Sequence, residues 1–399
     1  MPPSIKSNWN SGMDYGFSVI RKMMWLVGVW PLQHDDMVCT YRWIIIFIIE
    51  SLTVITLILE PLQNCGDTKD LLEVFLIIET GFHSWMNVVF ARIYMKKLAV
   101  NVNSAIDDWS SSLTQKNSYK LMTRYARLGR IITVSQLMCG LIAAIVYNIT
   151  IVVTNKPQIV IIGNETINLW TFVIPSTCLY RGISYSTHKA LLLMQIVQSF
   201  ILFVAECASD SFFFAITMHL SGQLELLRIR FVELIAKSGI NNYRRILSTW
   251  IRRHYKLTML AKNIEDTFNV IILIRLLITT IVIAVSGLRM LVSAKHQNFV
   301  DVVKSMIFVQ FFIVQSFLFT HAGETLREQS ESIVSTIYGT KWHKLPPVIV
   351  KDLIFIMMRS KIPLQITAGK FFYVTRSTTT DILKTALTYI SFLQVTMDE

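Results

Sequence analysis

Long apolar runs alternate with charged stretches along the whole chain, and this pattern predicts helices that cross a membrane. A helix needs about 20 predominantly apolar residues to span the hydrocarbon core of a bilayer. Six runs approach or exceed that length, at residues 43–59, 71–95, 131–153, 189–220, 270–291 and 302–322. A shorter apolar run at residues 378–396 opens on threonines and Asp381, which favour a helix N-terminus. The fold is therefore predicted to be all-α and polytopic, with seven transmembrane helices.

Helical periodicity continues beyond some of these spans. Apolar positions recur at helical spacing between residues 220 and 270, on both sides of a turn predicted at Gly239 and Asn241-Asn242, so the fourth and fifth helices are expected to project from the membrane. Pro346 and Pro347 favour the start of a helix over residues 348–358, and Pro363 ends it. The seventh element is thus predicted to be split in two.

Composition strengthens the membrane assignment and limits other chemistry. Hydrophobic residues make up 53% of the chain and charged residues 16%, compared with about 45–50% and about 25% in soluble domains. With no linker-like stretch, we predict one membrane domain. Its parts are residues 1–40 with an interfacial helix at 23–32, residues 41–323 with helices one to six, a cytoplasmic segment at 324–376 and the last helix at 377–399. The five cysteines lack metal-ligand spacing and predict neither a metal site nor a disulfide framework.

The distribution of basic residues predicts the orientation. The loops after spans two, four and six contain 24 Lys and Arg residues, whereas the alternate loops contain four. An excess of Lys and Arg marks cytoplasmic loops, so the N-terminus is predicted inside and the C-terminus outside. The better of the two glycosylation sequons, at Asn164, falls on the predicted outer side, while Asn148 lies too near the third span. The net charge of +12 lies in the inner loops, where anionic membrane lipids explain it without nucleic acid.

Several functional classes lack their signatures in this sequence. No paired-histidine metal motif, nucleophile elbow, phosphate-binding loop or CxxC is present, so we predict neither an enzyme, nor a catalytic residue, nor a cofactor. The predicted orientation is opposite to that of a G-protein-coupled receptor, and no inverted repeat typical of a transporter is visible.

The C-terminal region carries a more specific pattern. Residues 338–394 contain Tyr338-Gly339, Trp342 and Leu345-Pro346, followed by LIFIMMRSKIPLQITAGKFF and then ILKTALTYISFLQ. This order and spacing resembles the C-terminal signature of insect odorant receptors, and seven spans with an internal N-terminus extend the resemblance to the whole chain. The related gustatory receptors place five apolar residues between Thr-Tyr and Gln-Phe. Here four residues separate Tyr389 from Gln394, and Val395 follows, which weakens that alternative.

The resemblance implies a function and an assembly. A member of this family is expected to be a subunit of an odorant-gated, non-selective cation channel in the plasma membrane of olfactory sensory neurons. It is expected to form a heterotetramer with the odorant coreceptor, anchored by the cytoplasmic ends of helices four to six and the first half of helix seven. The second half of helix seven is expected to line the pore.

A pore-lining helix needs a face that tolerates water when open and closes with apolar side chains. Helical spacing offers three pairs of alternatives for that face, which are Leu387 or Thr388, Ser391 or Phe392, and Val395 or Thr396. By analogy with the family we favour Phe392 and Thr396. The alternative is that Phe392 packs against the fifth or sixth helix.

Odorants are small and apolar, so their site is expected to be a closed apolar pocket with few polar groups. The resemblance places it among helices two, three, four and six. The residues at matching depth are Phe75, Ile78, Glu79, Phe82, His83, Tyr147, Met194, Gln198, Phe308, Phe311 and Phe312. Ordinary interhelical packing is the alternative for each of them, and for Glu79 and His83 it is a mutual contact, since they share a helix face. Glu206 and Asp210 are expected to meet water or a basic side chain instead of a metal.

Overall fold

The structure is a computed structural model, and it describes residues 9–63, 68–112, 115–154, 158–162, 165–237, 243–295, 297 and 299–398, apart from some side chains within these ranges. The described helices are α1 (Ser11–Val27), α2 (Met37–Leu59), α3 (Thr68–Ile93), α4 (Met95–Ser112), α5 (Lys116–Thr154), α6 (Tyr185–Lys237), α7 (Tyr243–Lys295), α8 (Phe299–Gly339), α9 (Pro347–Ser360) and α10 (Arg376–Asp398). Two short antiparallel hairpins accompany them, β1 (Gln158–Ile162) with β2 (Glu165–Leu169), and β3 (Thr367–Ala368) with β4 (Phe372–Tyr373).

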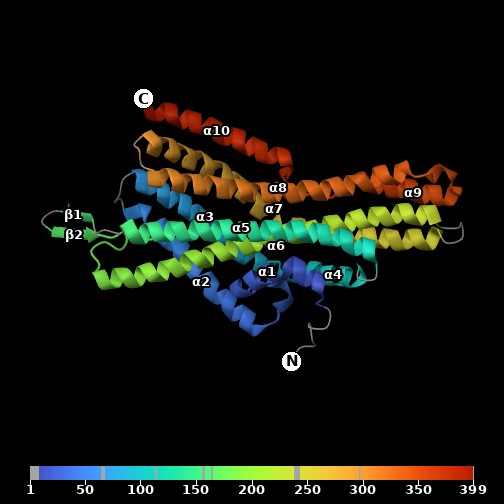
Figure 1. Ribbon diagram of the computed structural model, residues 1–399, viewed down its shortest axis with the longest axis horizontal. Coiled ribbons are helices and arrows are strands. Elements are labelled where there is room, and N and C mark those ends of the chain that lie inside the picture. Colours follow the sequence, from blue (N-terminus) through green and yellow to red (C-terminus); the bar gives the residue numbers. More distant parts are fainter. Residues whose placement is uncertain are drawn as a thin grey trace.

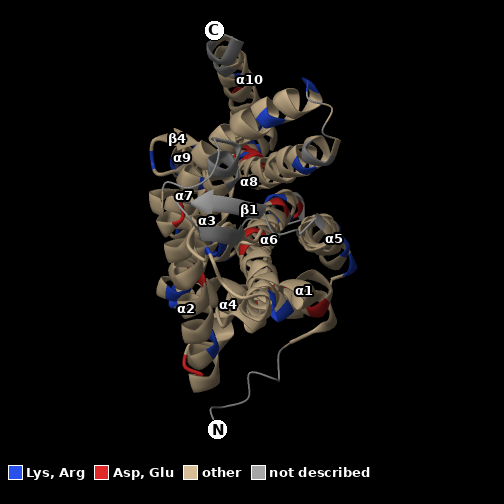
Figure 2. Ribbon diagram, turned by 90° about the vertical axis from the view of Figure 1, so that its left-hand side faces the viewer, with Lys and Arg blue, Asp and Glu red and all other residues tan. Residues whose placement is uncertain are grey.

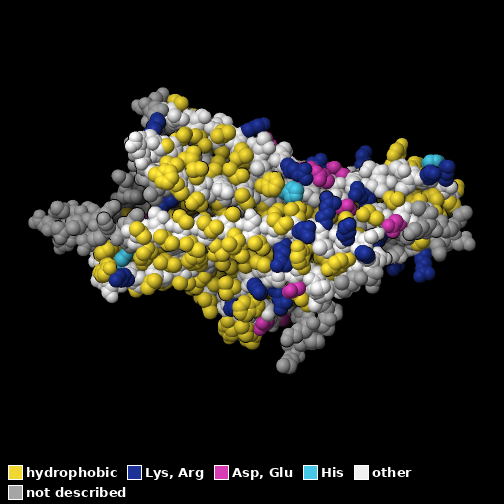
Figure 3. Space-filling model, in the orientation of Figure 1, with side chains coloured by type: hydrophobic (Ala, Val, Ile, Leu, Met, Phe, Trp, Pro, Cys, Tyr) yellow, Lys and Arg dark blue, Asp and Glu magenta, His cyan; other side chains and the backbone are white. Residues whose placement is uncertain are grey.

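The fold is an elongated helical bundle with β1 and β2 at one end and α9 at the other (Figure 1). In the described part of the chain six helices, α2, α3, α5, α6, α7 and α8, are long and apolar enough to cross a membrane. Five of the predicted spans lie within them, whereas the second, at residues 71–95, runs past the end of α3 at Ile93 to the start of α4. The helix α10 forms the seventh, although its hydroxyl-rich sequence is less apolar than the other six. Hydrophobic side chains cover the half of the surface toward β1 and β2, whereas Lys and Arg gather toward the α9 half (Figure 3).

Three helices extend far beyond the membrane thickness, as predicted. The helices α6 and α7 have 53 residues each and α8 has 41, against about 20 needed for a span. Their extensions reach the end of the bundle where α9 packs (Figure 1). The seventh element is split, because α9 and α10 are separated by the β3–β4 hairpin. The turn predicted between α6 and α7 lies outside the described residues.

The N-terminal segment differs from the sequence prediction. Instead of a helix at residues 23–32, α1 begins at Ser11, ends at Val27 and buries one face against α5 and α6. Asn10 accepts a hydrogen bond from the Met13 amide at 3.0 Å, which caps the helix, and Gly28 ends it in the left-handed conformation. Trp30, expected at headgroup level, is buried within the chain. The segment is therefore part of the protein core.

The helix α4, which the apolar pattern did not predict, is held to the bundle by a buried charge cluster. Asp108 lies 3.2 Å from the His219 ring nitrogen and 2.6 Å from the Arg253 guanidinium. Burial alone would raise the pKa of the Asp108 carboxyl, but the hydrogen bond with His219 and the charge of Arg253 lower that pKa below its ordinary value. One carboxylate thus ties α4 to both α6 and α7.

The opposite end of the bundle is fixed by a carboxylate and a disulfide. Glu60, at the end of α2, accepts hydrogen bonds from the backbone amides of Cys178 and Leu179 at 2.8 and 3.0 Å. Cys178 is disulfide-bonded, a pairing that the cysteine spacing did not predict. Asn164 lies outside the described residues, and Asn148 is buried, as expected for a poor glycosylation acceptor.

The helix α10 packs on α7 and α8 through one narrow face (Figure 2). Ile382 and Ala386 are buried on this face, and Ile390 packs against the same core. The hydroxyls of Thr320 on α8 and Thr379 on α10 lie 2.7 Å apart, which links the two helices by a hydrogen bond. The remaining faces of α10 are largely exposed in the single chain.

Candidate functional site

A cavity of about 170 Å³ lies among α3, α5, α6 and α8, closed on one side by the segment that follows β2. An apolar cavity of about 150 Å³ is large enough to hold a benzene ring. The lining residues are Ile77, Thr80, Gly140, Ala143, Ala144, Val146, Tyr147, Asn148, Val173, Ile174, Ser199, Leu202, Phe203, Glu206, Lys304, Ile307, Phe308 and Phe311. Most of these side chains are apolar, so the cavity suits a small apolar molecule.

Sequence and structure agree on the helices that surround the cavity but only partly on the residues. Of the predicted ligand-binding residues, Tyr147, Phe308 and Phe311 line it, and the rings of Tyr147 and Phe308 pack edge to face at a centroid distance of 6.5 Å. The other predicted residues do not line the cavity. Three of them, Phe75, Phe82 and Met194, are exposed on the outside of the bundle. Two are half-buried, Ile78 and Gln198, and three are buried elsewhere, Glu79, His83 and Phe312.

Apart from Tyr147, the residues of α5 that line the cavity were missed by the sequence prediction. Gly140, Ala143 and Ala144 precede Tyr147 at helical spacing and lie on one face of the helix. Small side chains on that face leave room for the cavity, which large residues would fill. The small residues at helical spacing are visible in the sequence of the third span, and this pattern could have predicted the lining of the cavity.

A buried polar cluster lies next to the cavity, centred on Arg275 of α7. Its guanidinium forms an ion pair with Glu206, a cavity-lining residue, and its Nη2 lies 3.8 Å from Asp210 Oδ2. Arg275 Nη1 also donates to His83 Nδ1 at 3.0 Å. These contacts join α3, α6 and α7 by charge-assisted hydrogen bonds. Glu206 and Asp210 thus meet a basic side chain, as the sequence predicted.

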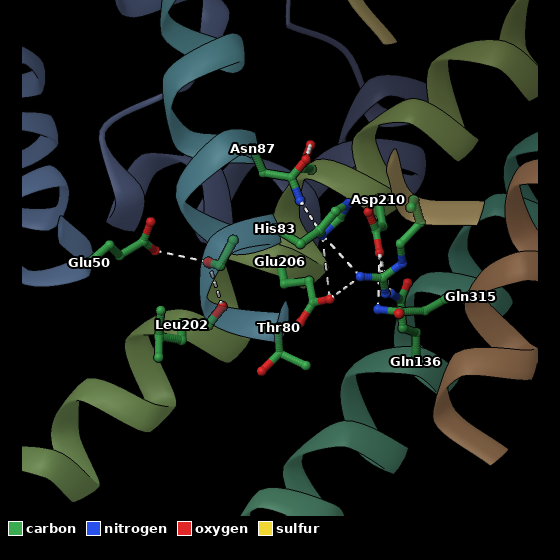
Figure 4. Close-up of polar contacts among 12 residues, drawn as sticks. Glu50, Thr80, His83, Asn87, Gln136, Leu202, Glu206, Asp210 and Gln315 are labelled. Carbon is green, nitrogen blue, oxygen red and sulfur yellow. Dashed lines mark hydrogen bonds and ion pairs between the residues drawn. The ribbon is translucent and has the colours of Figure 1, made fainter. Parts of the chain in front are cut away.

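Amide side chains extend the cluster to two more helices (Figure 4). Gln315 of α8 and Gln136 of α5 both donate to Asp210 Oδ2, at 3.1 and 3.5 Å. Asn87 Nδ2 lies 3.3 Å from His83 Nδ1, whereas no hydrogen bond joins Glu79 to His83 in the described part of the chain. The His83 ring is hydrogen-bonded to Arg275 instead, so no hydrogen bond supports the mutual contact expected for that pair. The cluster connects five helices around the inner end of the cavity.

The cluster has the properties of a structural network, not of a metal site. Among the described residues no group of three or more His, Cys, Asp or Glu side chains could hold a metal ion. Arg275 is fully buried, and removing one member of a buried ion pair leaves an uncompensated charge. The polar cluster therefore fixes the relative positions of the helices that form the cavity.

The last helix presents the predicted pore residues on its free faces. Thr388, Ser391, Phe392 and Val395 are exposed, as is Leu387, while Thr396 lies in α10 with a side chain that is not described. Helical geometry puts Thr388, Ser391 and Val395 opposite the buried Ala386, with Phe392 and Leu387 on the flanks. A second molecule or water can reach this face.

The fold and the cavity define a class of protein, namely a polytopic helical membrane protein with a largely apolar site between its spans. Comparisons with known proteins give the family. The family described as 7tm Odorant receptor matches residues 70–387, and the chain belongs to the insect odorant receptor family. This is a family of receptors and not of enzymes.

Individual relatives are distant. Odorant receptor 13a of Drosophila melanogaster is 27% identical over 188 residues, which cover 43% of this chain and 45% of that protein, so the match spans less than half of the relative. Odorant receptor 10 of Aedes albopictus is 21% identical over 388 residues, covering 94% of this chain and 96% of the relative. The solved insect olfactory receptor OR5 from Machilis hrabei has the same fold, with a TM-score of 0.74 and 14% identity over 95% of this chain and 99% of that one.

Proposed function

We propose that this chain is the odorant-binding subunit of a ligand-gated, non-selective cation channel that it forms as a heterotetramer with the odorant coreceptor. The observation that carries this proposal is the apolar cavity among α3, α5, α6 and α8 in a chain of the odorant receptor family. Its volume and lining suit a small volatile molecule, and the aromatic rings of Phe308 and Phe311 supply much of the contact surface. The related receptor OR5 from Machilis hrabei has been solved in complex with eugenol.

The connection from the cavity to the last helix runs along α8. Phe308 and Phe311 contact the cavity, Gln315 binds the polar cluster, and Thr320 is hydrogen-bonded to Thr379 of α10. A ligand that binds one position of α8 better than another shifts the equilibrium between those positions. Because α8 and α10 are joined, we propose that this shift moves α10 and opens the pore.

The exposed face of α10 supports its role as the pore wall. Thr388 and Ser391 offer hydroxyls, Val395 and Phe392 offer apolar side chains, and all four are exposed in the single chain. Four copies of such a face around an axis would give a pore with polar and apolar rings. By helical geometry Thr388, Ser391 and Val395 face away from the rest of the bundle, with Phe392 on the flank of that face. Phe392 and Thr396 are the positions that the family pattern favours for the pore.

The α9 end supports an oligomer. Large apolar side chains that would be unfavourable in water are exposed there, including Phe355 at 74%, Met358 at 67% and Tyr255 at 65%. A contiguous apolar patch on a water-exposed segment is typical of a subunit interface. We therefore assign residues 324–376, with the extensions of α6 to α8, to the cytoplasmic anchor between subunits.

The orientation follows from the charges. On the face shown in Figure 3, Lys and Arg gather in the α9 half of the molecule and hydrophobic side chains predominate in the other half. The positive-inside rule places the α9 end and the N-terminus in the cytoplasm and the C-terminus of α10 outside. The proposed location is the plasma membrane of olfactory sensory neurons, and Asn164 stays a predicted glycosylation site in a loop that the charges assign to the outer side.

Electrical recording tests the proposal. The chain, the coreceptor, or both are expressed in oocytes, surface expression is measured, and currents are recorded during application of a panel of volatiles. We expect a volatile in the panel to evoke a cation current only in cells that contain both chains, beyond what the coreceptor alone gives. Surface expression of both chains without any such current would contradict the proposal.

A further inference from the structure

We infer that the cavity selects volatiles that carry a hydroxyl group, an alcohol or a phenol, and that Glu206 accepts the hydrogen bond from this hydroxyl. The inference rests on the proposed odorant-binding function and adds the chemical class of the ligand. Its basis is a carboxylate oxygen with no hydrogen bond from the described residues, at the inner end of a predominantly apolar cavity.

The two oxygens of Glu206 have different surroundings. Oε1 forms the ion pair with the Arg275 guanidinium and lies 3.6 Å from His83 Nδ1. Oε2 accepts no hydrogen bond from the described residues, and it is not among their fully enclosed unpaired atoms, so it retains accessible surface. Glu206 as a whole is 5% exposed and lines the cavity. The free oxygen therefore borders the cavity and not the outside of the bundle.

The neighbouring contacts hold the carboxylate in this position. Figure 4 shows Glu206 between His83 and Thr80. Arg275 cannot leave Oε1 without losing one of its two carboxylate partners at a fully buried position. The geometry of the acceptor is thus fixed before a ligand binds, which reduces the ordering cost of binding.

Among the other polar groups on the wall, the Lys304 ammonium lies 5.7 Å from the centroid of the Tyr147 ring, and the hydroxyl and amide groups are hydrogen-bonded within the chain. Thr80 Oγ1 donates to the Ile77 carbonyl at 3.0 Å, and Tyr147 donates its hydroxyl to the Val173 carbonyl at 3.2 Å. Asn148 Nδ2 donates to the Ala144 carbonyl at 2.7 Å. Glu206 Oε2 is therefore the strongest acceptor that the inner end of the cavity offers to a ligand.

An acceptor of this kind discriminates between donors and isosteres. An alcohol or phenol satisfies Oε2, because its O–H donates to a carboxylate. An ether, ester or hydrocarbon of similar shape removes water from Oε2 without replacing the hydrogen bond, which carries the desolvation cost of a charged group. A site built to bind a hydroxyl rejects the analogue that lacks it much more strongly than a hydrophobic site rejects a missing methylene. A protonated amine could also donate, but it pays the larger cost of burying its own charge.

The experiment uses matched pairs of ligands on the full chain expressed with its coreceptor. Each alcohol or phenol of the panel is tested beside its O-methyl ether, and the half-maximal concentration for current is compared. We expect every active hydroxyl compound to act at a concentration about ten-fold or more below that of its ether, since a hydrogen bond to a charged group is worth that much. In Glu206→Gln the ratio should fall to about three-fold or less.

The control variant is Glu50→Gln, which changes a buried carboxyl near the same cluster that does not line the cavity. It should keep the wild-type ratio, and surface expression is measured for all chains. If the half-maximal concentrations of the ethers lie within about three-fold of those of their hydroxyl partners on the wild-type chain, the inference is overturned while the receptor function stands. This comparison uses the wild-type chain alone, so it does not depend on the folding of a variant. An unchanged ratio in surface-expressed Glu206→Gln also overturns it. If no volatile evokes current, the proposed function fails and the inference fails with it.

Discussion

Removal of the Arg275 side chain should cost much of the stability of the bundle. Arg275 is fully buried and is the only Arg or Lys paired with Glu206 and Asp210 in the described part of the chain. Its replacement by Met in Arg275→Met retains volume but leaves two carboxylates facing each other without a counter-charge. Breaking a buried ion pair by removing one partner typically costs about 3–5 kcal/mol.

The structure also gives the control and the rescue for this variant. Arg327 is paired with Glu331 at 2.8 Å one turn away on an exposed surface, and exposed pairs of this spacing contribute about 0.3–0.5 kcal/mol. Arg327→Met should therefore be nearly neutral. Adding Glu206→Gln to Arg275→Met removes one of the two carboxylates that have lost their counter-charge. The double variant should therefore recover a part of the lost stability.

The assay measures the melting midpoint of the detergent-solubilised protein. Melting is monitored as the loss of the monodisperse peak in size-exclusion chromatography after heating. A loss of about 3–5 kcal/mol corresponds to a midpoint lower by roughly 4–6 °C in a chain of this length. If Arg275→Met melts within about one degree of the wild type while Arg327→Met behaves the same, the buried pair does not organise the bundle and the reasoning is refuted.

Three other predictions follow from single contacts. Phe308→Ala should raise the half-maximal ligand concentration about ten-fold by removing a cavity wall, whereas Phe75→Ala, on the outside of the bundle, should leave it unchanged; equal effects in concentration–response curves would contradict the assigned cavity. A cysteine at Thr388 should be modified by a charged thiol reagent with a change in current, while one at the buried Ala386 should not, and equal reactivity would argue against the exposed face of α10. Because its folded-state pKa is lowered, Asp108 stabilises the protein above its unfolded pKa, near 3.8, and this contribution disappears as pH falls through the lower folded value. The melting difference between wild type and Asp108→Asn should therefore be present at neutral pH and vanish under acid conditions; a difference that grows with acidity would contradict the sign.

Apolar periodicity is a local property, and it was enough to locate the membrane helices. The end of α2 at Glu60-Pro61, the start of α9 at Pro347 and the division between α9 and α10 also follow from short-range rules about proline and caps. The helix α4 was not predicted, because its sequence is as rich in Lys, Asn, Asp and Ser as that of a soluble helix, and its burial comes from contacts with distant helices.

The candidate site shows where local rules stop. The sequence indicated which helices surround the ligand, but helix rotation decides which face of each is turned inward. Phe75 and Phe82 were predicted inside and lie outside, while Gly140 and Ala143, which look unremarkable in the sequence, line the cavity. The sequence predicted that Glu206 would meet water or a basic side chain. Its position at the inner end of the cavity depends on how α6 packs against α3 and α8.

The sequence by itself determined the number of long membrane helices, the charge asymmetry that orients them and the split of the last element, because each depends on residues close together in the chain. The tertiary structure alone decided how the helices rotate, and hence that Arg275 of α7 meets Glu206 and Asp210 of α6. It also decided that one oxygen of Glu206 is left for a ligand. These contacts join residues up to 69 positions apart in the chain, and no local pattern encodes a distance between side chains on separate helices.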